Sequence, residues 1–195
     1  MLIDLHCHTK VHSACSALTP DALVRAARAR GLDGVCITEH DALWPQAEVQ
    51  RISEEMGFVV LRGMEVTTEV GHVLVFGMPH HAPEMATLAE LHRVVRAEGA
   101  LMYLAHPSRR YGTLPPDDLA SYFDSVEVHN GTEGMLQNDN AARLARALAL
   151  PGIGGSDAHA VREVGICATE FGADVRDEMS FLAALRAGAY RARRV

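Results

Sequence analysis

The sequence predicts an α/β fold with a mostly parallel sheet, arranged as a small or distorted βα barrel. Short apolar segments of strand character alternate with helical segments, which is typical of such folds. Nearly every polar cluster follows a strand and precedes a helix, and in parallel barrels this edge carries the catalytic groups. The chain has 195 residues, fewer than the about 250 typical of an eightfold barrel. We therefore expect a smaller or distorted barrel.

The composition is that of one globular domain covering residues 1–195, with 48% hydrophobic and 22% charged residues. The sequence contains neither a signal-peptide pattern nor an apolar run near the roughly 20 residues of a membrane helix. We expect a cytoplasmic protein that does not bind membranes. A net charge of -7 disfavours an extended nucleic-acid interface. The sequence does not indicate an oligomeric state.

The first expected strand, residues 3–9, carries two histidines on one face. Alternate side chains of an extended strand point the same way, so His6 and His8 can reach one metal ion. A helix follows, because Thr19-Pro20-Asp21 combines an N-cap, a first-turn proline and an acidic residue suited to the helix dipole. Gly31 ends that helix.

The remaining elements continue the alternation, and most strands lead into polar residues. We expect strands at 34–38, 58–61, 72–76, 100–105, 125–128, 152–156 and 164–169. We expect helices at 45–56, 85–97, 116–122, 137–148 and 179–186. The side chains that follow the strands include His40, Glu65, His106, His129, Asp157 and His159. These side chains should meet at one edge of the barrel.

Six motifs together resemble the PHP family, the polymerase and histidinol phosphatase family. They are D-L-H-C-H-T (4–9), I-T-E-H-D (37–41), G-M-E (63–65), A-H-P (105–107), E-V-H-N (127–130) and G-S-D-A-H (155–159). The resemblance spans almost the whole chain, with the motifs in family order. It implies a distorted (βα)7 TIM-like barrel, the PHP fold, with two or three divalent metals and phosphoester hydrolysis.

The resemblance also implies the ligands of each metal. His6, His8, Glu65 and Asp157 correspond to one site, and Glu65, His106 and His129 to a second that Glu65 bridges. His40 and His159 correspond to a third site, which an Asp or His in the loop after the first strand completes in many relatives. Here Cys15 replaces the usual Asp, and His12 is the other candidate.

The residue types themselves favour several transition-metal ions. One zinc ion takes about four protein ligands, whereas eight candidate ligands follow six strands here. Imidazoles with a minority of carboxylates suit Zn or Mn, with Fe a third choice, better than Mg or Ca. We expect His72 to be a hydrogen-bonded structural residue. We expect Glu127 to be a poorer ligand candidate than His129.

The leading functional hypothesis is a metal-dependent phosphoric ester hydrolase acting on a small phosphomonoester or nucleotide, including an oligonucleotide end. A hydroxide between two metal ions would attack phosphorus, with Glu65, His8 and Asp157 as the catalytic residues. Arg109, Arg110 and Arg162 are candidates to bind the phosphate.

Two alternatives stay open. One is amidohydrolase-like cleavage of a C-N bond, since metal-activated water also serves that chemistry. The other is a non-catalytic, metal-stabilised PHP module that supports a partner in DNA metabolism.

Overall fold

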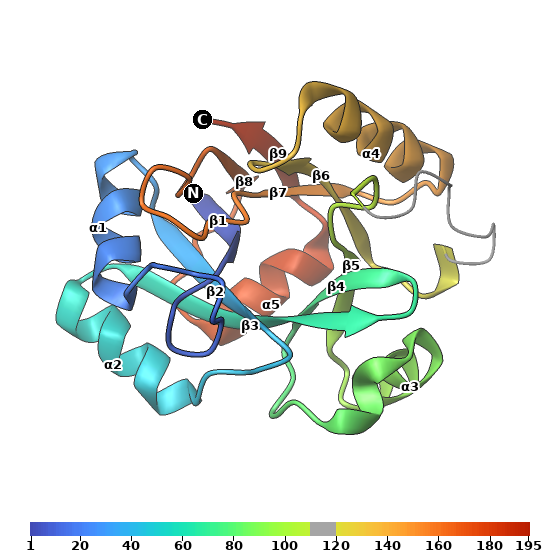
Figure 1. The fold of residues 1–195 in the computed structure, drawn as a ribbon, viewed down its shortest axis with the longest axis horizontal. Helices are drawn as coiled ribbons and strands as arrows, with labels where there is room; N and C mark the ends of the chain where they lie inside the picture. The colour runs from blue at the N-terminus through green and yellow to red at the C-terminus, as the bar shows by residue number, and fades with distance from the viewer. Residues whose placement is uncertain (110–119) are drawn as a thin grey trace.

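The computed structural model describes residues 1–109 and 120–195 and shows a curved sheet with helices around it (Figure 1). The described residues form nine strands in the order β7-β6-β5-β4-β3-β2-β1-β8-β9. The sheet almost closes, because Thr169 Oγ1 on β8 donates to the carbonyl of Gly154 on β7 (2.8 Å) and accepts from its N–H (2.9 Å). The expected α/β fold of distorted barrel type is confirmed.

The elements follow one another with short connections. The strands are β1 (Leu2–Cys7), β2 (Gly34–His40), β3 (Val59–Thr68), β4 (Gly71–Phe76), β5 (Leu101–Leu104), β6 (Ser125–Asn130), β7 (Gly152–Gly155), β8 (Cys167–Phe171) and β9 (Tyr190–Arg194). The helices are α1 (Pro20–Ala29), α2 (Gln46–Met56), η1 (Pro83–Ala86), α3 (Leu88–Ala97), α4 (Met135–Ala147) and α5 (Glu178–Ala187). The helix expected at 116–122 lies largely outside the described residues.

The sheet is less parallel than expected. Among the described strands, four of the eight neighbouring pairs are antiparallel. Strand β3 continues to Thr68 and turns back into β4 through a tight hairpin, in which the Thr68 hydroxyl donates to the carbonyl of Gly71 (2.7 Å). Glu65 therefore lies within β3, not beyond it. Strand β9 was not expected, because its sequence Tyr-Arg-Ala-Arg-Arg has little of a strand's apolar character.

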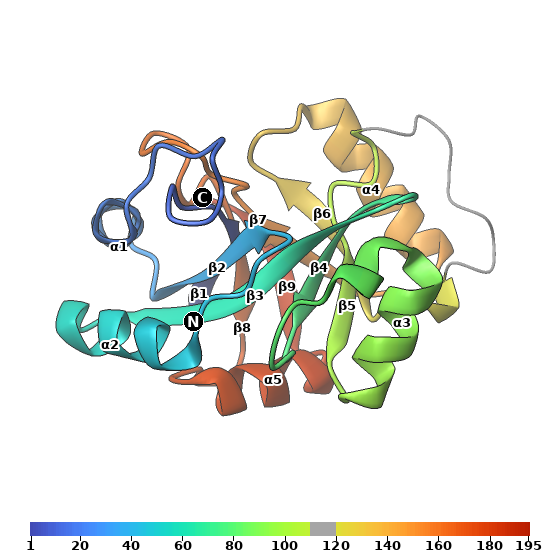
Figure 2. The same cartoon turned by 60° about the horizontal axis from the view of Figure 1, so that its bottom comes forward.

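One end of the barrel is closed by α5, and the loops that follow β1 and β7 lie at the other end (Figure 2). The helix begins with a capping box in which Asp177 and Ser180 bond each other's backbone N–H. Its buried Phe181 and Leu185 pack among interior side chains such as Ile3. The loops that carry His8 and Asp157 therefore lie at the end opposite α5.

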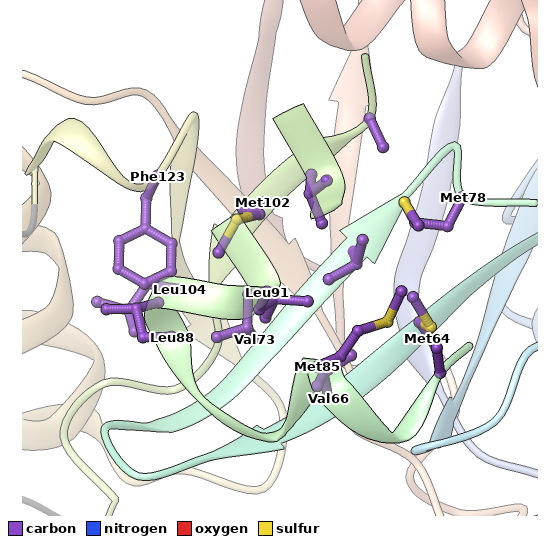
Figure 3. Close-up of a cluster of buried hydrophobic side chains, with 14 of the residues drawn as sticks. Met64, Val66, Val73, Met78, Met85, Leu88, Leu91, Met102, Leu104 and Phe123 are labelled. Carbon is purple, nitrogen blue, oxygen red and sulfur yellow. The ribbon is translucent and has the colours of Figure 1, made fainter. Parts of the chain in front are cut away.

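A second apolar cluster supports β3, β4 and β5 from outside (Figure 3). Met64 and Val73 come from the hairpin, and Leu91 from α3. Together these clusters make the framework on which the strand ends are held. Within the described part of the chain, no helix has the length and apolar character needed to cross a bilayer.

Candidate metal centre

Two imidazoles and two carboxylates converge at the open end of the barrel. His6 and His8 come from β1 and the residue after it, Glu65 from β3, and Asp157 from the loop after β7. One ligand atom from each lies within 4.8 Å of those of the other three. His8 Nε2 is 3.2 Å from Glu65 Oε2 and 3.3 Å from Asp157 Oδ1. All four side chains are buried.

The facing atoms of this group lack hydrogen-bond partners. Four of the unpartnered buried side-chain atoms in the described structure are His6 Nε2, His8 Nε2, Glu65 Oε2 and Asp157 Oδ1. Leaving one buried polar atom without a hydrogen bond costs about 1–3 kcal/mol. Packing alone therefore does not explain why four such atoms face one another. Nitrogen and carboxylate oxygen at this spacing fit a divalent transition metal. We conclude that the residues present suit a metal ion.

Glu65 is placed to serve more than one ion. Its Oε1 is 2.7 Å from His72 Nδ1 and 2.8 Å from His106 Nε2, while its Oε2 is 3.0 Å from His40 Nδ1. The two oxygens thus face different groups of imidazoles. His72 was expected to be a hydrogen-bonded structural residue; it does hydrogen-bond Glu65, and it also belongs to a group that could hold a metal. The signal that could have found it is strand period, since the alternate residues Leu74 and Phe76 of β4 also point into the barrel.

Three histidines form a further group beside the first. The His8 ring lies 4.3 Å from that of His40 and 4.4 Å from that of His159, between ring centroids. One nitrogen from each lies within 4.8 Å of the other two. His12 instead has its ring 5.2 Å from Trp44, and Cys15 is exposed. Neither joins a metal-capable cluster within residues 1–109 and 120–195.

The structure does not bring His129 to the metal centre. The pairing of β6 with β7 shifts register between Glu127 and His129, so these two residues do not share a face as they would in a regular strand. Glu127 points inward and is fully buried, whereas His129 is partly exposed. His129 Nδ1 is unpartnered, yet no metal-capable group in the described structure includes it. Burial and the charge of Arg194 lower the pKa of His129.

Glu127 supports the site from behind. Its Oε1 is 2.9 Å from His6 Nδ1, and its Oε2 accepts hydrogen bonds from the backbone N–H of His106 (2.8 Å) and from Asn130 Nδ2 (3.0 Å). A histidine that donates through one ring nitrogen presents the other to a metal. Glu127 therefore turns His6 Nε2 toward the cluster. The sequence did not reveal this role.

Two candidate ligands have backbone angles that L-residues rarely adopt. The φ angle is +23° at His106 and +54° at Asp157. Such conformations persist only where the surrounding contacts enforce them, and they are concentrated at functional sites. The hydrogen bond from the His106 N–H to Glu127 is one such contact.

The buried carboxylate of Glu39 fixes the loop after β1. Glu39 accepts hydrogen bonds from the Thr9 N–H (3.0 Å), the Ser13 hydroxyl (2.5 Å) and Trp44 Nε1 (2.9 Å). Ser13 in turn accepts from the backbone N–H of His40 (3.2 Å). This network holds the loop beside the three-histidine group.

The electrostatics of the group favour bound positive charge. Burial by itself would raise the pKa values of Glu65 and Asp157, but neighbouring imidazoles lower both well below the usual range. Burial by itself would lower the pKa of His6, but Glu127, Glu65 and Asp157 raise it well above its usual value. The carboxylates therefore stay ionised and draw cations to the site.

The candidate phosphate-binding arginines differ in their surroundings. Arg109 Nη2 is 2.5 Å from Asp157 Oδ2, and its Nε is 2.7 Å from Glu133 Oε1. Arg162 has a largely exposed side chain, 2.9 Å from Glu163 Oε1. Arg110 lies outside the described residues. Arg109 is thus part of the centre, and the structure does not place Arg162 on it.

The sequence resembles two known proteins over part of its length. At the sequence level, the chain is 25% identical over 150 residues to an uncharacterized protein of Methanocaldococcus jannaschii, covering 71% of this chain and 88% of that protein. It is 26% identical over 102 residues to a 5'-3' exoribonuclease of Haemophilus influenzae, covering 50% of this chain and 36% of the exoribonuclease.

Solved structures share the fold. A two-domain protein from Bacteroides vulgatus, described as containing a predicted PHP-like metal-dependent phosphoesterase, matches with a TM-score of 0.74 and 21% identity over 99% of this chain and 64% of its own. An amidohydrolase from Chromobacterium violaceum, with bound sulfate, matches with a TM-score of 0.72 and 18% identity over 98% and 97% of the two chains.

Models of protein families match both halves of the sequence. The model described as PHP domain covers residues 4–111, and the model described as PHP-associated covers residues 136–190. The first alone spans more than half of the chain. The expected resemblance is therefore confirmed: this chain belongs to the PHP family.

Proposed function

We propose that this protein is a metal-dependent hydrolase of phosphate esters, acting on a small phosphomonoester or on a nucleotide, including the end of an oligonucleotide. The proposal depends above all on the four unpartnered ligand atoms of His6, His8, Glu65 and Asp157, which face one another inside the barrel mouth. Two further findings support this proposal. The chain belongs to the PHP family, and a structural neighbour is described as containing a predicted metal-dependent phosphoesterase.

In this proposal His6, His8, Glu65 and Asp157 hold the first cation. Glu65 also reaches a second, beside His72 and His106, while His40 and His159 hold a third with His8 nearby. The imidazole-rich donor set favours Zn or Mn, with Fe a third choice. Divalent cations in such a site supply a water-derived nucleophile at neutral pH and neutralise charge on phosphoryl oxygens.

The chain's own residues keep this donor set in order. Glu65, His8 and Asp157 are the proposed catalytic residues because they surround the point where the groups meet, with ligand-atom separations of 3.2 and 3.3 Å from His8. Glu127 fixes the ring of His6. Burial of the carboxylates strengthens their attraction for cations because little water screens them.

A comparison of Glu65→Gln with Glu55→Gln tests the proposal. Glu55 is an exposed residue of α2, paired with Arg51, and serves as a matched control. We expect wild type and Glu55→Gln to copurify with metal and to release phosphate from nucleoside monophosphates or p-nitrophenyl phosphate. Glu65→Gln should lose both the metal, by elemental analysis, and the activity. An unchanged rate of phosphate release in Glu65→Gln would contradict the mechanism.

Cleavage of a C-N bond is the second candidate, favoured by the fold shared with the Chromobacterium amidohydrolase. Ammonia release from amide or amidine substrates, without phosphate release from esters, would support it. A protein that binds metal but cleaves neither class would instead support a metal-stabilised module that assists a partner.

A further inference from the structure

We propose that Arg109 is a positioning residue that selects which oxygen of Asp157 faces the cation. In this role it acts with Asn130 and Thr132 and does not bind the substrate phosphate. The inference rests on the proposed metal-dependent function and adds a role for these three side chains. It replaces the expectation that Arg109 binds the phosphate.

The two carboxylate oxygens of Asp157 have opposite surroundings. Oδ1 is buried without a hydrogen-bond partner and lies 3.3 Å from His8 Nε2. Oδ2 accepts from Arg109 Nη2 (2.5 Å), from the Thr132 hydroxyl (3.1 Å) and from Asn130 Nδ2 (3.3 Å). An oxygen with three donors has little capacity left for a metal. Asp157 is therefore set to bind a cation through Oδ1 alone.

Arg109 is itself held from two directions. Its Nε donates to Glu133 Oε1 (2.7 Å) on the loop before α4, and its backbone N–H donates to the carbonyl of His106 (3.0 Å). The planar guanidinium can bond two carboxylates at once in a fixed geometry. Arg109 thus ties the His106 loop, the loop after β6 and Asp157 together. Arg109 Nε and Nη2 already donate to Glu133 and to Asp157, whose side chain is 2% exposed, so binding a phosphate through either nitrogen would compete with these hydrogen bonds.

The other two donors are also fixed in place. Asn130 Oδ1 accepts from the backbone N–H of Thr132 (2.9 Å) and lies 2.8 Å from the Thr132 hydroxyl, whose single proton can go either to it or to Asp157 Oδ2. Asn130 Nδ2 also donates to Glu127 (3.0 Å). Asn138 on α4 bonds both the N–H and the carbonyl of Asn130. The donors to Asp157 Oδ2 are therefore arranged before any cation binds, which lowers the cost of ordering the ligand.

The test compares Arg109→Gln and Thr132→Val with the control Arg25→Gln, whose exposed side chain on α1 pairs with Asp21. Affinity for Zn²⁺ and Mn²⁺ is measured by competition with a chelator, and kcat and KM are measured at saturating cation. We expect Arg109→Gln to weaken one cation site at least about tenfold, as loss of a residue supporting a ligand typically does. KM should stay within about twofold of wild type.

Thr132→Val removes one donor to Oδ2 and keeps the side-chain shape, so it should weaken the same site by a smaller factor. The control should match wild type. Far-UV circular dichroism of the metal-free variants identifies any that fail to fold. An unchanged cation affinity in both Arg109→Gln and Thr132→Val would overturn the proposal. A raised KM with unchanged cation affinity in Arg109→Gln would overturn it in favour of phosphate binding.

Failure of the proposed function gives a different pattern. Cation binding is measured without turnover, so a wild-type protein that binds cations but cleaves no phosphate ester refutes the phosphoesterase assignment and still permits the Arg109 comparison. A wild-type protein that binds neither Zn²⁺ nor Mn²⁺ refutes both.

Discussion

Replacing Glu127 by Gln is expected to weaken cation binding while the barrel stays folded. The side chain is fully buried, with Oε1 beside His6 Nδ1 and Oε2 accepting from the His106 N–H and Asn130. A glutamine of the same shape has only one oxygen, so its NH₂ group must face a donor. Two arrangements are open to it, and each has a measurable cost.

If the NH₂ group faces His6, Nδ1 must become an acceptor, and the proton moves to Nε2, the nitrogen that faces the metal centre. If it faces His106, a buried N–H loses its acceptor. Either change costs about 1–3 kcal/mol, which corresponds to roughly 5- to 150-fold in an equilibrium constant. The first arrangement lowers cation affinity, and the second lowers the stability of the metal-free protein.

Chelator competition with Zn²⁺ measures the affinity, and thermal unfolding of the metal-free protein measures the stability. Glu170→Gln is the matched control, because Glu170 is a β8 carboxylate paired with Arg191 and Arg193 outside the metal centre. It should leave cation affinity unchanged. If Glu127→Gln equals wild type in both affinity and unfolding midpoint, the supporting role assigned to Glu127 is refuted.

Three further predictions follow from other parts of the structure. His72→Ala should reduce bound metal, measured by elemental analysis, whereas His129→Ala should leave it unchanged; the reverse result would restore His129 as a ligand. Gly155→Ala should lower the unfolding free energy by about 1–3 kcal/mol, because a Cβ there would lie 2.4 Å from the Cβ of His6; an unchanged melting temperature would contradict this. Asp177→Ala removes an N-cap and should cost about 1 kcal/mol at neutral pH. Hydrogen bonds from the serine in the first turn of α5 lower the pKa of Asp177, so its contribution is complete above the ordinary aspartate pKa and is lost as the pH falls through the lowered value. Urea unfolding across this pH range should therefore show the difference between wild type and Asp177→Ala shrinking on acidification.

Much of the centre could be predicted because it depends on simple strand geometry. His6 and His8 share a face of β1, and Glu65, His106 and Asp157 each follow or end an apolar strand segment. These relations need only the period of an extended chain and the rule that strand ends gather at one edge. The structure brings all five residues into the linked groups around Glu65.

The positions of Glu127, His129 and His72 relative to the site depend on how their strands pair with neighbouring strands. A regular strand puts positions 127 and 129 on one face, and only the register shift between β6 and β7 separates Glu127 from His129. His72 enters the site because β4 runs antiparallel to β3 and pairs its position with Thr67. Strand period alone puts His72 on the face of β4 that points into the barrel, but its place beside Glu65 and the register shift at His129 depend on the neighbouring strands.

The same dependence explains why sequence cannot separate a ligand carboxylate from one that supports a ligand. Asp4, Glu39 and Glu127 are as deeply buried as Glu65 and lie on the same strands as candidate ligands. Both oxygens of Asp4, Glu39 and Glu127 accept hydrogen bonds, several of them from segments that carry candidate ligands, such as the N–H groups of His6 and Thr9.

Glu65 and Asp157 differ from these three in one respect, because each keeps one buried oxygen without a hydrogen bond. A carboxylate whose oxygens are both saturated is fixed in orientation and can orient others, whereas one with a free oxygen can bind a cation. Arg109 falls on the supporting side of this division, since it donates to Asp157 Oδ2, whereas Oδ1 is buried without a hydrogen bond. Among the described residues, the pattern of unpartnered atoms, and not the residue type, therefore distinguishes the acids that could hold a metal.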